Sequence, residues 1–130
     1  YKFFKNHIMT VENFKIVAQI VIALSIYNVW FLRFNKPTMF RGKNAQNMKQ
    51  EFISYGLPGW FTWIVGFIKV SLATMLVLGI FQKQLVFPSA IGMAILMFGA
   101  VMMHVKVKDS PIKSFPAFIF LILSISIAFL

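Results

Sequence analysis

Two side chains in this sequence combine an ionisable group with a place in or beside a long apolar stretch. Lys69 lies near the middle of the run 61–80, and such a run can cross a bilayer because a spanning helix needs about 20 mostly apolar residues. An ammonium near the bilayer centre costs about 2.5–3.5 kcal/mol on insertion scales. Lys69 is therefore expected to face protein, water or a ligand. His104 lies at the end of another apolar run, 85–105.

Two roles are open for Lys69. In the first, its ammonium contacts a substrate, an anion or a quinone headgroup inside the protein, or carries a proton. In the second, the side chain extends along its stem toward the interface, or pairs with a backbone carbonyl or with the face of Trp63 or a Phe. The acidic residues Glu12, Glu51 and Asp109 all fall in loops or at the ends of apolar runs, so no carboxylate within a span completes a proton relay.

His104 also has a chemical and a structural role open to it. The chemical role is a quinone contact, since haem held between helices usually needs two histidines at similar depth and His7 falls on the opposite side of the membrane. The structural role pairs His104 with Glu51 or Asp109 and fastens the loops together. No metal site is expected, because the 2 His and 3 acidic residues lack the spacing of zinc or di-iron ligands.

The composition is that of a membrane protein. Of 130 residues, 59% are hydrophobic and 12% charged, which is more apolar surface than a soluble domain of this size can bury. The 13 Lys and Arg give a net charge of +10 and flank the apolar runs, as in proteins that contact anionic lipid headgroups. No aromatic and basic binding module accompanies this charge, so nucleic acid is not expected as a partner. The lack of Cys excludes thiol redox chemistry and iron–sulfur ligation.

Four apolar runs predict an all-α fold, an integral membrane antiparallel four-helix bundle in a single domain, 1–130. The expected spans are 15–32, 59–80, 85–105 and 115–130. Ser25 and Asn28 share a face of the first span and are expected to point into the bundle. Trp30 is expected at the membrane interface, where tryptophan rings gather at the level of the headgroups.

The connections between the spans differ in length. The segment 33–54 is long and polar, and it is expected to contain a short helix lying on the membrane with three residues on its apolar side, Met48, Phe52 and Ile53. Gly56 and Pro58 then turn the chain into the second span. The fourth span begins at either Ser110–Pro111 or Ser114–Pro116, and it is apolar nearly all round, so it is expected to face lipid.

Positive charge predicts the orientation in the membrane. The loops 33–54 and 106–114 carry eight Lys or Arg, against four at the other end, Lys2, Lys5, Lys15 and Lys83. Both loops are therefore expected in the cytoplasm, with both termini outside. Because position 1 is not Met, we expect that residues before Tyr1 are missing or were processed.

Four stretches of the sequence occur in the same order in a known family. They are FRGKNAQNMKQEF at 40–52, YGLPGW at 55–60, VGFIKVSLATMLVLG at 65–79 and MFGAVMMHVKVKDSPIKSFPA at 97–117. Through them the chain resembles the DoxX-like membrane proteins. The resemblance implies a four-helix fold in the bacterial cytoplasmic membrane and a small subunit of a membrane redox system, such as a thiosulfate:quinone oxidoreductase, or an assembly chaperone as in animal relatives. Many members carry an acidic residue where this chain has Lys69, so a role of that carboxylate does not transfer.

Two functions are open for this chain, and the first is the one that we expect. The first is a non-catalytic accessory or assembly subunit of a larger membrane complex or homo-oligomer, with no cofactor beyond a bound lipid. The second is a quinone-linked redox component in which Lys69 and His104 contact the headgroup between the second and third spans. The depth of these two residues distinguishes the functions, because a quinone site needs both side chains within reach of one headgroup.

Overall fold

The structure, a computed structural model, describes the backbone of residues 2–130 and the side chains of residues 10–130. Within these residues there are five α-helices and no strand. Four segments are long and apolar enough to cross a membrane, namely Thr10–Leu32, Gly59–Leu78, Lys83–Lys106 and Pro111–Phe129. The predicted all-α membrane bundle is confirmed. The side chains of Lys2 and Lys5, which enter the charge count above, lie outside the described residues.

The first helix, α1 (Lys2–Tyr27), begins before the expected start at residue 15 and continues as a π-helical turn over Asn28–Leu32. Its buried side chains recur every three or four residues and face the other helices: Ala18, Gln19, Ile22, Ala23, Ile26 and Trp30. The depth of Trp30 at the membrane interface stays a prediction, but its ring is only 8% exposed and packs inside the bundle. The reason is Gly66 on the neighbouring helix, which lacks a Cβ and leaves room for the indole ring.

The polar segment after α1 folds across one end of the bundle. It contains a 3-10 turn, Gly42–Asn44, and the short helix α2 (Met48–Ser54), which Asn47 caps by accepting a hydrogen bond from the backbone N–H of Gln50 at 2.9 Å. Met48 and Phe52 are buried against the core, whereas Ile53 is 53% exposed. The expected apolar side of α2 is therefore narrower than predicted, because successive helical residues point about 100° apart.

The remaining three spans follow with short connections. Gly56, in the left-handed conformation at φ 85°, and Pro58, the N-cap residue, lead into α3 (Gly59–Leu78). A 3-10 turn at Lys83–Leu85 then joins α3 to its antiparallel neighbour α4 (Val86–Lys106). The last helix, α5 (Pro111–Phe129), has proline in its first turn, so the Ser110–Pro111 start is the one adopted, about one turn before the expected residue 115.

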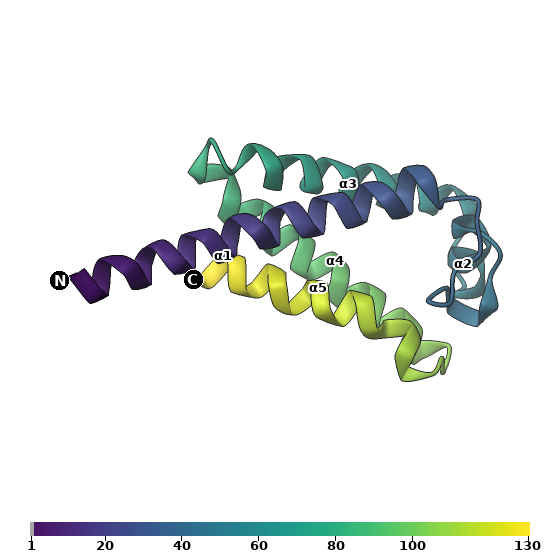
Figure 1. Cartoon of the computed structure of the whole chain (residues 1–130). Helices are drawn as coiled ribbons and strands as arrows, with labels where there is room; N and C mark the ends of the chain where they lie inside the picture. Colours follow the sequence, from purple (N-terminus) through teal and green to yellow (C-terminus); the bar gives the residue numbers. More distant parts are fainter. Residues whose placement is uncertain (1) are drawn as a thin grey trace.

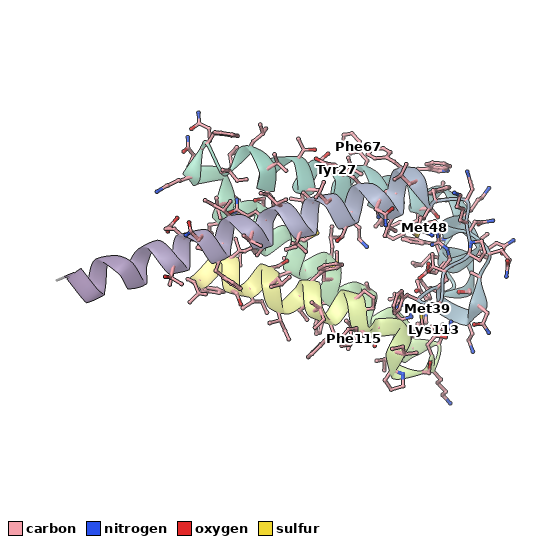
Figure 2. The ribbon with its side chains drawn as sticks, viewed as in Figure 1. Tyr27, Met39, Met48, Phe67, Lys113 and Phe115 are labelled. Atoms are coloured by element: carbon pink, nitrogen blue, oxygen red, sulfur yellow. The ribbon has the colours of Figure 1, made fainter. Side chains whose placement is uncertain are left out.

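The two chain ends lie at one end of the bundle, and α2 with the α4–α5 connection lies at the other, which we call the loop end (Figure 1). The two basic loops therefore share one end, as an antiparallel arrangement requires. The outer faces are apolar. Phe67 on α3 and Phe115 on α5 project away from the other helices in Figure 2, and α5 buries only Ser124 and Ile127. Such faces are suited to contact lipid tails.

Candidate functional site

A cavity of about 870 Å³ lies between the four spans at the loop end. We call it the central cavity. Its walls come from α1, α3, α4 and α5, and α2 with the preceding loop closes it; its apolar lining includes Ile26, Phe61, Val65, Met97, Ala117 and Phe120. Figure 2 shows Met39, Met48 and Lys113, which also line it, at this end of the bundle. Its volume falls within the range of about 300–1,000 Å³ that is usual for small-molecule sites.

Both candidate residues from the sequence, Lys69 and His104, line the central cavity. They stand at different depths. Lys69 lies ten residues after Gly59 along α3, roughly 15 Å from the loop end, and His104 lies two residues before the end of α4, roughly 3 Å from it. Because helical side chains tilt toward the helix N-terminus, the Lys69 side chain leans back toward the loop end and reduces this separation.

The ammonium of Lys69 contacts an aromatic ring and makes no hydrogen bond or ion pair among the described residues. Its Nζ atom lies 5.8 Å from the centroid of the Trp30 ring, within the range of a cation–π interaction. Trp63, which the sequence offered as the ring partner, instead stacks on Phe34 at 4.8 Å and is 61% exposed. Lys69 is half-buried. The hydrogen-bond donors of its ammonium have no acceptor among the described residues.

A buried ion pair closes the loop end of the central cavity. Arg41, from the first loop, places Nη1 2.9 Å from Oε2 of Glu51 on α2, and both residues are buried. Arg41 also donates to the carbonyl oxygens of Arg33 and Lys36. Tyr55 lies one helical turn after Glu51, and its hydroxyl donates to Oε1 of Glu51 at 2.6 Å. These contacts satisfy the Glu51 carboxylate entirely within the protein.

His104 links this pair to the α4–α5 connection. Its Nδ1 lies 2.8 Å from Oδ2 of Asp109, and its Nε2 lies 3.4 Å from the Tyr55 hydroxyl. The second oxygen of Asp109 accepts a hydrogen bond from the backbone N–H of Lys43 at 3.0 Å. The sequence left Glu51 and Asp109 open as partners of His104, and both lie beside it: Asp109 is the closer one, whereas Oε1 of Glu51 lies 3.9 Å from Nε2 and is also linked through the Tyr55 hydroxyl. We call Arg41, Glu51, Tyr55, His104 and Asp109 the loop-end network.

The environment sets the protonation of two members of this network. Burial, and after it the negative charge of Glu51, raises the pKa of Tyr55 well above its usual value, so the hydroxyl stays protonated and can donate to Glu51. Burial alone would raise the pKa of Asp109. The hydrogen bonds from His104 and from the Lys43 backbone outweigh burial, however, and the pKa of Asp109 falls below its usual value.

Two lysines tie the loops together from outside this network. Lys106 donates to the Tyr55 carbonyl oxygen at 2.9 Å. Lys113 donates to the carbonyl oxygen of Arg41 at 2.6 Å and to the side-chain oxygen of Asn44 at 2.9 Å. Three of the eight cations at this end, Arg41, Lys106 and Lys113, therefore hold one segment of the loop end to another.

The other residues singled out from the sequence take different places. Ser25, which is half-buried, and Asn28, which is exposed, both line the central cavity. Gly56 and Pro58 form the turn between α2 and α3. Sequence reasoning did not single out Gln19, which is 2% exposed and donates from Nε2 to the Leu76 carbonyl oxygen at 2.8 Å. The feature that could have indicated this role is an amide within an apolar run, since such a group must find a hydrogen-bond partner inside the membrane.

Comparison with known proteins found one family. The model of the DoxX-like family matches residues 16–126, which is most of the chain. The search among curated proteins and the search among solved structures found no match.

The ion pair gives a stability prediction. Glu51→Gln removes the counter-charge of buried Arg41 and should destabilise the protein by about 3–5 kcal/mol, because an unpaired buried charge is costly. Thermal unfolding in mild detergent measures the loss. Glu12→Gln is the matched control, since Glu12 lies near the other end without an ion pair among the described residues.

A second variant separates charge from shape. The double variant Arg41→Met, Glu51→Leu removes both charges and should unfold at a temperature closer to wild type than Glu51→Gln does, because apolar replacement of a whole buried pair is often nearly neutral. Equal unfolding temperatures for Glu51→Gln and Glu12→Gln would contradict the assigned importance of the pair.

Proposed function

The chain belongs to the DoxX-like family of membrane proteins, and from this premise we propose that it is a non-catalytic accessory subunit of a larger membrane complex that binds a membrane-dissolved amphiphile in the central cavity. The observation that carries this proposal is the ammonium of Lys69, which faces the cavity from within a span and has no hydrogen-bond partner among the described residues. Ionisable groups inside membranes are costly, and they commonly mark ligand sites or pathways.

The outer surface supports a role within a larger assembly. α5 exposes a row of large apolar side chains along its length, including Phe115, Phe118, Ile122 and Ile125. In a bilayer this face contacts lipid or a spanning helix of another protein, since both are equally apolar. A larger complex or a homo-oligomer can therefore form along α5 without rearrangement of the bundle.

A quinone-linked redox component is the second candidate function. It is favoured by the shared cavity of Lys69 and His104 and by the hydrogen bonds that run from His104 to Asp109 in the α4–α5 connection. A quinone ring carries two acceptor oxygens on opposite edges, so one oxygen would face Lys69 and the other His104 and Tyr55. In this function the chain positions the quinone, and a partner subunit carries out the electron transfer.

Purification of the native protein from its own membrane in a gentle detergent tests both functions. Mass spectrometry then identifies co-purifying proteins and extracted lipids or quinones. The accessory function predicts a larger membrane complex in stoichiometric amount and a bound lipid that Lys69→Leu releases. A bound quinone that Lys69→Leu releases supports the second function instead. Protein that arrives alone and without any bound amphiphile contradicts both.

We also propose that the protein lies in the bacterial cytoplasmic membrane with its loop end in the cytoplasm. The eight cations of the two basic loops support this orientation, and the two acidic residues there, Glu51 and Asp109, are engaged in internal contacts.

The absence of Cys allows a direct test of orientation. Lys108→Cys places a single thiol at the exposed loop end, and Lys83→Cys places one at the other end. In intact cells a membrane-impermeant maleimide should label Lys83→Cys and spare Lys108→Cys until the cells are broken. Labelling in the reverse order would contradict the proposed orientation.

A further inference from the structure

We infer that the ligand of the central cavity is an amphiphile with an acidic headgroup, a carboxylate or a phosphate, that pairs with Lys69. This inference rests on the proposed binding function and adds the chemical class of the ligand. It follows from the charges of the cavity, from the satisfied state of its other polar groups and from the path that a hydrophobic tail can take.

The cavity lining has more positive than negative charge. It includes four cationic side chains, Arg33, Arg41, Lys69 and Lys113, against one carboxylate, Glu51. Glu51 is not available to Lys69 as a direct partner, because it binds Arg41 at 2.9 Å and accepts from Tyr55 at 2.6 Å. A ligand with negative charge would therefore complement the cavity.

Among the cations at the cavity, Lys69 lies deepest in the spans and makes no hydrogen bond among the described residues, whereas Arg33 is exposed. Arg41 and Lys113 donate to backbone and side-chain oxygens of the loops. Both ring nitrogens of His104 also have partners, Asp109 and Tyr55. Within the part of the chain that the structure describes, Lys69 contacts the Trp30 ring alone, whereas an ammonium offers three hydrogen-bond donors.

An acidic headgroup satisfies Lys69 better than a neutral one does. A quinone or alcohol oxygen can accept one hydrogen bond from Lys69 but leaves its positive charge uncompensated within the membrane. A carboxylate or phosphate accepts stronger, charge-assisted hydrogen bonds and also neutralises the site. Away from bulk water this attraction is weakly screened, so the acid should be clearly preferred.

The rest of the cavity provides a place for the tail. Its walls near Lys69 are apolar, with Ile26 and Val65 on α1 and α3 and Met97 and Phe120 on α4 and α5. α1 and α5 touch, and in the view of Figure 1 they diverge toward the loop end. Both helices line the cavity there, and Asn28 on its α1 side is exposed. Ile95, which also lines the cavity from within α4, is 65% exposed, so a tail that follows these apolar walls can reach the bilayer.

Equilibrium binding of radiolabelled palmitate to the purified full chain, in a scintillation proximity assay, tests the inference. Unlabelled palmitate and lysophosphatidate should both compete, and their relative strength distinguishes carboxylate from phosphate. Hexadecanol has the same tail with a neutral head, and it should compete at least about tenfold more weakly, as should a quinone.

Four variants locate the headgroup and the cavity. Lys69→Met should weaken palmitate binding at least about tenfold, whereas Lys69→Arg keeps the charge and should largely retain binding. Lys36→Met removes an exposed loop cation and should leave binding unchanged. Gly99→Phe should block binding by filling the cavity, because Gly99 lines it and a Cβ there meets nothing within 4 Å. Thermal unfolding of each variant verifies that it is folded.

The outcomes separate this inference from the proposed function beneath it. One set of results would contradict the acidic headgroup alone: hexadecanol or the quinone competes as well as palmitate, Lys69→Met binds like wild type, and Gly99→Phe does not bind. The cavity would then bind amphiphiles, but without a preference for an acidic headgroup. If Gly99→Phe binds palmitate like wild type, or if none of the amphiphiles binds, the cavity is not the binding site and the proposed function fails as well.

Discussion

The loop end is organised around the ion pair between Arg41 and Glu51, because neither buried charge can remain there without the other. Glu51 is on α2, and Arg41 belongs to the loop that returns from α1, so the pair fixes α2 across the end of the bundle. Tyr55 extends the contact to His104, which in turn holds Asp109 beside the first loop. The first loop, α2 and the α4–α5 connection are thereby held together. As a result, α2 closes the space that the diverging spans leave between them.

Lys69 differs from the charged residues of the loop-end network because it lacks a hydrogen-bond or ion-pair partner among the described residues. In that network the charged side chains already have opposite charges or backbone oxygens as partners. They therefore need no ligand to satisfy them. Lys69, deeper in the membrane, has the face of Trp30 and an open cavity. The contrast between a satisfied cluster at the surface and an unsatisfied ammonium beneath it is the physical basis of the proposed binding function. It also explains why the cavity favours a ligand that supplies negative charge.

The parts of the fold that follow from short stretches of sequence, such as the spans, were predictable from the sequence alone. The apolar runs predicted the membrane bundle, and the four stretches at 40–117 indicated the family that matches residues 16–126. Features that depend on contacts between distant residues were not predictable in the same way. Trp30 enters the core only because Gly66 lies opposite it on another helix. Arg41 gains its importance from Glu51 in the next element, and Tyr55 gains part of its importance from His104 on α4, so neither role is indicated by the sequence around it. Lys69 and His104 were recognised as unusual, but their shared cavity emerges only when α3 and α4 are packed against the other spans.

The proposed binding of an acidic amphiphile depends on one atom, the Nζ of Lys69, and solid-state NMR can observe that atom directly. The protein would be labelled with ¹⁵N at its lysine side chains, reconstituted in bilayers and supplied with palmitate carrying ¹³C at its carboxyl carbon. We expect a ¹⁵N–¹³C dipolar contact at salt-bridge distance, within about 4 Å between charged groups, that disappears in Lys69→Met and persists in Lys36→Met, as the proposed pairing requires. A contact that survives Lys69→Met, or the absence of any contact in the wild type at saturating palmitate, would contradict it.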